Sequence, residues 1–493
     1  MSERGASGKA AGDISMDSRE VAASLFQKQQ KIYARAVSGW FAGWRWALVW
    51  LTQLAYYGGP WLEWSGRQAL LFDLAGRRFY IFGLVFYPQD FIYLSGLLIV
   101  CAYALFLFTA VAGRLWCGYA CPQTVYTELF MWIERRIEGD RPQQMKLDAA
   151  PWSAGKALRK TSKHLVWLAL GLWTGITLVG YFTPIRELWA SVLTLGLGPW
   201  EWFWILFYGL ATYGNAGFLR EQVCKYMCPY ARFQGAMFDP QTLIIGYDRN
   251  RGEPRGPRGR KTDLQAAELG HCIDCGLCVQ VCPTGIDIRN GLQYECIGCA
   301  ACIDVCNHVM DKMHYPRGLV RYDTQAGLDE PQNRSPLLRR LWRPRVLVYS
   351  VVLLLLCAGL GAGLMTRSPF RVDVVRDRGV MARTVEDGWV ENVYRLQIMN
   401  ATEMPQRYHV SATGLPEITG AISRTSDPDQ RGEVQLNGAE ARWVALALRV
   451  PPEVAARAGT GSHPIVFTVS QQPTTPADAG RQVLEKSSFI VPR

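Results

Sequence analysis

Residues 272–283 read CIDCGLCVQVCP, and residues 296–306 read CIGCAACIDVC. Each stretch places four cysteines at the spacing C-x2-C-x2-C-x3-C, which is typical of proteins that hold two [4Fe-4S] clusters. In that pattern three close cysteines wrap one cluster, and the fourth cysteine reaches the other cluster. The sequence therefore predicts one cluster on Cys272, Cys275, Cys278 and Cys306, and a second cluster on Cys296, Cys299, Cys302 and Cys282.

Two other uses of these eight cysteines fit the pattern less well. Structural zinc sites rarely repeat a run of four cysteines at this spacing, and disulfides are rare in the cytoplasm, where we expect this segment to lie. The second stretch departs from the first at Asn307, which stands where Pro283 follows the first run. This difference alters the turn and removes no ligand.

Five segments of the 493-residue chain are long and apolar enough for a bilayer, which needs about 20 mostly apolar residues per helix. They are residues 40–57, 91–112, 165–184, 200–218 and 346–365. The first segment contains Arg45, a charge that a span tolerates near its end, where the side chain can reach the interface. Residues 1–35 are mostly polar and show no signal peptide. We expect an α-helical transmembrane core of about five spans.

The net charge of +11 is concentrated in two of the connecting segments. Residues 113–163 contain nine Lys and Arg, and residues 219–345 are also basic, whereas residues 185–199 contain only Arg186. Cytoplasmic loops carry such an excess, so this distribution predicts a multi-pass protein of the bacterial inner membrane with a cytoplasmic N-terminus and a periplasmic C-terminus. The arginines of residues 249–260 have no interleaved aromatic residues for stacking bases, which favours a solvated or headgroup-facing linker over nucleic-acid binding.

Two further cysteine pairs share one form, CGYACP at residues 117–122 and CKYMCP at residues 224–229. Each pair follows the cytoplasmic end of a predicted span. A residue before proline is disfavoured in a helix, so we expect Cys121 and Cys228 to lie in turns where the next helix begins. Four neighbouring thiols suit a soft metal such as Cu(I), zinc or an iron–sulfur cluster, or dithiol–disulfide exchange. Simple packing is the alternative, and the residues leave these choices open.

Beyond the last predicted span, residues 368–493 contain short alternating runs such as VYRLQI at 393–398 and WVALAL at 443–448. Segments rich in turn residues separate these runs, as in an immunoglobulin-like β-sandwich. The region has no cysteine. It either docks a partner outside the membrane or serves as a passive stabilising cap.

The predicted fold class is thus a multidomain membrane protein with an α-helical transmembrane core, an inserted 2[4Fe-4S] ferredoxin-like domain and a C-terminal immunoglobulin-like β-sandwich. The predicted units are a cytoplasmic polar tail (1–35), a core with four spans and both C-x3-C-P motifs (36–248), a cytoplasmic linker and ferredoxin domain (249–343), the fifth transmembrane helix (344–367) and a periplasmic β-sandwich (368–493).

In this ordered combination of motifs, and in the stretches GPWL at 59–62 and RGLVRY at 317–322, the chain resembles a cytochrome c oxidase accessory family. That family is called CcoG, FixG or RdxA, and the resemblance covers nearly the whole chain. NapH-type proteins, which are linked to quinol, are similar in the membrane core and lack the external domain.

The resemblance implies an oxidoreductase that assists assembly of cbb3-type cytochrome c oxidase by reducing Cu(II) to Cu(I). It implies that Cys117, Cys121, Cys224 and Cys228 act on the copper, as substrate or bound ion, and that the two clusters supply electrons from an unidentified donor. The implied partners are oxidase assembly factors and a copper exporter or chaperone, and the chain is compatible with a homo-oligomer. Two alternatives stay open: a quinol-linked electron-transfer module that feeds a reductase, and a redox-sensing assembly scaffold.

Overall fold

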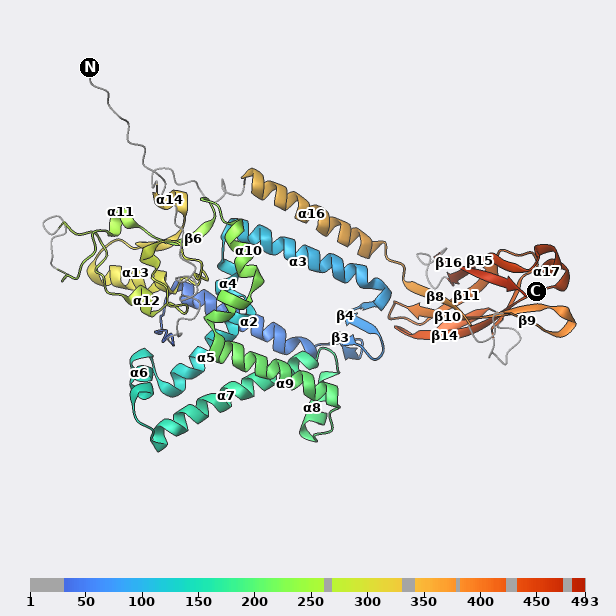
Figure 1. Ribbon diagram of the computed structural model, residues 1–493, viewed down its shortest axis with the longest axis horizontal. Coiled ribbons are helices and arrows are strands. Elements are labelled where there is room, and N and C mark those ends of the chain that lie inside the picture. The colour runs from blue at the N-terminus through green and yellow to red at the C-terminus, as the bar shows by residue number, and fades with distance from the viewer. Residues whose placement is uncertain are drawn as a thin grey trace, which may run out of the picture.

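The computed structural model describes residues 31–260, 268–329, 342–377, 382–422, 432–472 and 481–492. The molecule is elongated, with the ferredoxin cysteines at one end, long helices in the middle and a β-domain at the other end (Figure 1). The predicted multidomain fold class is confirmed.

Helices occupy all five predicted spans. They are α2 (Trp40–Gly58), α3 (Phe91–Ala112), α7 (Ala154–Val179), α9 (Pro199–Gly214) and α16 (Pro344–Met365). Within the described ranges, three helices are long and apolar enough to cross a membrane, and these are Pro88–Ala112, Ala154–Val179 and Pro344–Met365. Helix α9 has 16 residues and continues into π-helical turns, and α2 carries Arg45, so spans at these two helices remain predictions.

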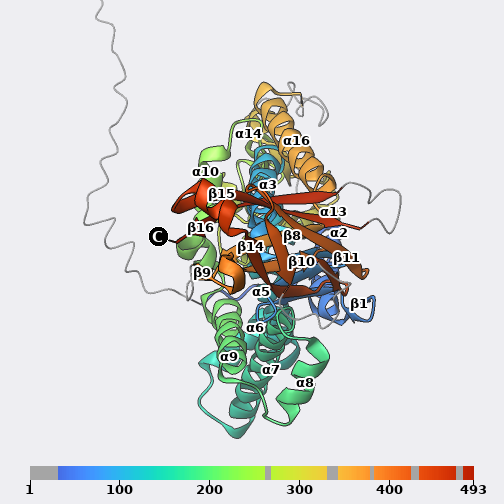
Figure 2. The same ribbon diagram turned by 90° about the vertical axis from the view of Figure 1, so that its right-hand side faces the viewer.

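Four of these five helices form two pairs. In the first pair, α3 packs on α16, where the Tyr93 hydroxyl donates to the Gly363 carbonyl at 3.0 Å. In the second pair, α7 packs on α9 through Gly171, whose missing Cβ leaves room for the Gly209 carbonyl. Figure 2, in which the β-domain faces the viewer, shows α7 and α9 on one side of the long axis and α16 on the other.

Shorter helices connect these pairs. Their bounds are α4 (Leu115–Tyr119), α5 (Pro122–Glu138), α6 (Arg141–Ala149), α8 (Ile185–Leu193), the π-helical segments η3 (Asn215–Leu219) and η4 (Val223–Met227), and α10 (Pro229–Met237).

In the sequence, the ferredoxin cysteines fall between the strands β6 (Leu243–Tyr247) and β7 (Val320–Thr324), which pair in antiparallel fashion. The helices of this unit are α11 (Arg249–Gly252), α12 (Leu277–Gln280), α13 (Ala301–Met313) and α14 (Gln325–Asp329). Ile303 and Met310 of α13 are buried against Leu319, which precedes β7, and this core fixes the cysteine loops to the strand pair.

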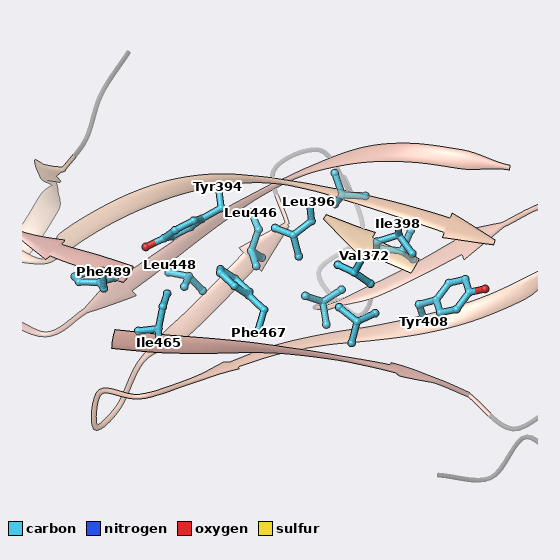
Figure 3. Packing of buried hydrophobic residues seen from close by; sticks show 14 of the residues in the cluster. Val372, Tyr394, Leu396, Ile398, Tyr408, Leu446, Leu448, Ile465, Phe467 and Phe489 are labelled. Atoms are coloured by element: carbon cyan, nitrogen blue, oxygen red, sulfur yellow. The ribbon is translucent and has the colours of Figure 1, made fainter. Parts of the chain in front are cut away.

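The β-domain is a sandwich of two antiparallel sheets with orders β12-β14-β10-β8 and β13-β11-β15-β16, in which β9 also pairs with β10. Its strands are β8 (Phe370–Arg376), β9 (Arg383–Thr384), β10 (Val390–Asn400), β11 (Gln406–Thr413), β12 (Thr419–Ile422), β13 (Glu433–Leu436), β14 (Ala441–Val450), β15 (Gly461–Gln471) and β16 (Gln482–Val491), with the short helix α17 (Pro452–Ala458) after β14. Alternation along the strands buries one face of each sheet, and Tyr394, Leu446 and Phe467 meet between the sheets (Figure 3).

A small β-module between α2 and α3 was absent from the sequence-based prediction. It comprises β1 (Glu63–Trp64), β2 (Arg67–Gln68), β3 (Leu70–Asp73), β4 (Arg78–Ile81) and β5 (Leu84–Phe86). Tyr80 and Val85 of this module form a buried cluster with Met399 of the β-domain. Next to the cluster, the buried Asp90 pairs with Arg367 at 2.5 Å and with Arg371 at 2.9 Å. The β-domain is therefore held to the helical core by side-chain packing and ion pairs as well as by the chain that connects them.

Candidate electron-transfer site

The structure gathers the eight ferredoxin cysteines into two groups. The first group, which we call the outer tetrad, lines one hollow and consists of Cys272, Cys275, Cys278 and Cys306. The second group, the inner tetrad, lines a second hollow and consists of Cys282, Cys296, Cys299 and Cys302. These are the groups that the crossed spacing predicts, and their role as cluster ligands remains our prediction.

The residues around both hollows fit iron–sulfur clusters. Gly276 and Gly298 adopt left-handed backbone angles, with φ of 65° and 70°, which let the chain turn sharply between neighbouring cysteines. Burial raises the pKa of Cys296 and of Cys306 to about 12 each. Thiols in such surroundings stay protonated at neutral pH unless a cation binds them, and iron deprotonates its thiolate ligands.

The C-x3-C-P motifs have the local structure that the prolines predict. Cys121 is the N-terminal cap of α5 and Cys228 is the cap of α10, and both have extended backbone angles. Cys117 lies on α4 and Cys224 lies in η4. Each motif thus presents one thiol from a short helical turn and one thiol at the start of the next helix.

The two motifs come together, although they are separated by about 100 residues in the chain. The thiols of Cys117 and Cys224 each lie within electrostatic reach of Cys121 and Cys228, so the four form a third group, which we call the membrane-side thiols. Burial raises the pKa of Cys117 to about 11 and that of Cys224 to about 12. In the part of the chain that the structure describes, no three His, Cys, Asp or Glu side chains are arranged for a single metal ion.

The membrane-side thiols adjoin the inner tetrad directly. Gly118 packs against the loop that contains Gly298 and Cys299 so closely that a Cβ on Gly118 would lie 2.7 Å from the Gly298 carbonyl oxygen and 2.9 Å from the Cys299 Cα. The Tyr322 hydroxyl donates to the same Gly298 carbonyl at 2.6 Å. No side chain stands between the two backbones at this point, which shortens the path between the two sulfur groups.

A buried arginine lies at this junction. The Arg114 guanidinium donates to the carbonyl oxygens of Cys296 and Ala231, each at 3.2 Å, and to that of Tyr294. Arg114 favours the charged forms of the Cys296 thiol in the inner tetrad and of the Cys117 thiol on the membrane side. No ion pair joins it to a carboxylate of the described residues, so its charge acts on both sulfur groups.

Arg45 points into the protein. Its side chain is 7% exposed. The guanidinium pairs with the buried Glu128 at 3.3 Å and lies near the Cys299 thiol. Arg45 of α2 therefore places a fixed positive charge beside the inner tetrad.

The second motif is held by a buried ion-pair network that the sequence analysis missed. Glu134 of α5 accepts from Arg220 at 2.7 Å and pairs with Lys163 at 3.2 Å and Lys31 at 3.4 Å. Arg220 precedes Cys224 by four residues, so this network ties the loop of the second motif to α5 and α7. The sequence did contain a signal for this network: acidic residues occur in α5, and lysines occur just before the third predicted span.

These features define a class: a membrane-associated iron–sulfur redox protein with an immunoglobulin-like domain. Comparison with known families agrees, because the sequence model described as "4Fe-4S binding domain" matches residues 94–139 and the "4Fe-4S dicluster domain" matches residues 219–325. The "IG-like fold at C-terminal of FixG" matches residues 360–492.

Similar full-length proteins identify the family. The chain is 38% identical to the nitrogen fixation protein FixG of Rhizobium meliloti (strain 1021) over 447 residues, which is 84% of this chain and 85% of that protein. It is 39% identical to protein RdxA and 40% identical to protein RdxB of Cereibacter sphaeroides, over 82% of this chain and 87% and 86% of theirs. The chain belongs to the FixG/RdxA family and is an iron–sulfur oxidoreductase.

Proposed function

We propose that this protein reduces Cu(II) to Cu(I) for the assembly of a cbb3-type cytochrome c oxidase. In this proposal Cys117, Cys121, Cys224 and Cys228 receive the copper, and the outer and inner tetrads hold the two [4Fe-4S] clusters. Bound clusters would supply electrons singly, which matches the one-electron change from Cu(II) to Cu(I). Each turnover adds one electron to the copper and needs no proton.

The observation that supports this proposal best is the contact of Gly118 with Gly298 and Cys299. It brings the first C-x3-C-P motif against the loop of the inner tetrad. An electron held by the inner tetrad would therefore lie beside the loop that carries the first pair of membrane-side thiols.

The membrane-side thiols suit the reduced product. Cu(I) is a soft ion and prefers thiolate ligands. Cys121 stands at the N-terminus of the 17-residue helix α5, where the backbone amides of Gln123 and Thr124 favour its thiolate, which opposes the effect of burial. Arg114 adds a positive charge beside Cys117. These groups favour thiolates and therefore stabilise Cu(I) over Cu(II).

The charge distribution supports the proposed location, and the family resemblance supports the proposed partners. We place the ferredoxin unit in the cytoplasm and the β-domain in the periplasm of the inner membrane, with unit boundaries near residues 36, 249, 344 and 368, because the basic segments border the ferredoxin unit. A copper exporter or a copper chaperone would take the product onward.

The test replaces all four membrane-side cysteines with serine in the full-length protein, purified without oxygen. We expect iron and sulfide content to stay at the level of two clusters while Cu(II) reduction, followed with a Cu(I)-specific chelator, is lost. The double variant Cys101→Ser/Cys357→Ser is the matched control, since both residues lie exposed on α3 and α16, outside the three cysteine groups. Undiminished copper reduction in the four-serine variant would refute the proposal.

A further inference from the structure

The outer tetrad is the group closest to solvent. Cys275 is exposed, whereas Cys299 of the inner tetrad is buried and contacts the core through Gly118. An electron that enters from outside and ends at the membrane-side thiols therefore meets the outer tetrad first. The surface around Cys275 is where a donor must approach.

An arginine-rich segment borders this entry point. Residues 249–260 contain five arginines and one glutamate. The backbone of this segment runs beside the first ligand of the outer tetrad, because the Cys272 amide donates to the Gly252 carbonyl and the Gly256 amide donates to the Cys272 carbonyl, each at 3.3 Å. The His271 amide also donates to the Arg251 carbonyl, at 2.8 Å. The arginines are thereby fixed next to the outer tetrad.

The positive charge of this segment faces solvent. Arg249, Arg255 and Arg260 are exposed. Glu253 stands 3.6 Å from Arg255, and both side chains are partly exposed, so this pair neutralises little. Together with the exposed Glu268, the described residues 249–260 and 268–270 carry a net charge of +3, from five arginines and two glutamates.

The acidic residues nearest to Cys275 already have a partner. Arg289 donates to Asp287 at 2.7 Å and also to Asp274. Because Asp274 and Asp287 interact with Arg289, they reduce the positive charge of residues 249–260 only slightly.

The position of the segment favours solvent over lipid headgroups. Helix α11, which begins the segment, lies on the side of the ferredoxin unit that faces away from α3 and α16, two of the helices long enough to cross a membrane (Figure 1). The arginine pattern fits a solvated or a headgroup-facing linker, and the structure favours the solvated one. A surface so placed meets soluble proteins.

We propose that residues 249–260 form the docking surface for a small acidic carrier protein that delivers one electron at a time to the outer tetrad. A positive surface beside an exposed redox site steers an acidic partner and speeds its association. The carrier would lose one electron and a cluster held by the outer tetrad would gain it, with no bond made or broken. This inference rests on the proposed function only in the direction of electron flow.

The test uses the full-length protein with its clusters and reduced flavodoxin as the probe, in stopped-flow mixing without oxygen. We expect the triple variant Arg249→Glu/Arg255→Glu/Arg260→Glu to be reduced about tenfold or more slowly than the native protein at low salt. The native rate should fall as salt rises, while reduction by dithionite, which needs no docking surface, stays the same in all proteins. The triple variant Arg395→Glu/Arg407→Glu/Arg457→Glu is the control, because it changes the charge equally at exposed positions of the β-domain.

Equal rates for the native protein and the arginine-segment variant, with equal salt dependence, would overturn the inference. So would a variant that loses binding to vesicles of anionic phospholipid while its flavodoxin rate is unchanged, since the segment would then serve membrane attachment. Failure of the proposed function would look different: the carrier would still reduce the clusters in the native protein, and Cu(II) would not reoxidise them.

Discussion

Replacing Gly118 with alanine should separate the membrane-side thiols from the inner tetrad. The new Cβ would lie 2.7 Å from the Gly298 carbonyl oxygen, whereas ordinary contact begins near 3.4 Å. The two loops must therefore move apart by about 0.7 Å, because both obstructing groups are backbone atoms, and overpacking of this kind costs about 1–3 kcal/mol. That cost corresponds to a folding equilibrium constant that is roughly 5- to 150-fold smaller.

We expect the Gly118→Ala protein to keep both clusters and to pass electrons to Cu(II) more slowly than the native protein, because the wider gap lengthens the path between the sulfur groups. The assay reduces the protein with dithionite, removes the excess, mixes it with Cu(II) and follows the return of the oxidised iron–sulfur absorbance. Gly43→Ala is the control, since Gly43 lies on α2 and its Cβ would meet nothing within 4 Å. If Gly118→Ala holds its full iron content and reoxidises as fast as the control, the Gly118 contact is not part of the electron path.

Three further predictions concern the buried charges. Glu128→Gln removes the carboxylate that Arg45 and Arg135 share and should destabilise the protein by about 3–5 kcal/mol in thermal unfolding, and the double variant with Arg45→Met should recover the part of this loss that comes from the buried Arg45. Arg114→Gln should lower the reduction potential of the inner cluster in a titration followed by electron paramagnetic resonance, Arg114→Lys should restore part of it, and an unchanged potential would contradict the assigned charge effect. Burial raises the pKa of Glu134, but Arg220 and the neighbouring lysines lower it by more, from 4.5 to about 2. The network should therefore stabilise the fold above pH 4.5 and lose that contribution as the pH falls towards 2, and unfolding temperatures of Glu134→Gln should lack this acid dependence.

Local patterns predicted much of the cysteine chemistry. Ligand spacing is a short-range property, so the two ferredoxin groups could be assigned from the runs at residues 272–282 and 296–306. The extended conformation of Cys121 and Cys228 followed from the proline after each, because proline restricts the residue before it. Apolar runs of sufficient length located all five long helices.

What the sequence could not predict are pairings through space. Nothing in the composition of α2 indicates that Arg45 pairs with Glu128 beside the inner tetrad. The small β-module at residues 63–86 consists of strands of two to four residues, too short for a periodic pattern, and its packing on Met399 depends on the distant β-domain. The contact of Gly118 with Gly298 likewise joins residues 180 positions apart, and a glycine in sequence carries no sign of what it touches.

The interleaving of the three cysteine groups along the chain constrains how this protein can be built. The membrane-side group is complete once Cys228 has been synthesised, before any residue of the ferredoxin runs exists. The outer group spans the whole insert and closes only with Cys306, ahead of the last apolar helix. During biogenesis the thiols of the helical core therefore exist before the insert that packs on them, so the order of translation leaves them open to oxidation or metal loading until the insert has folded.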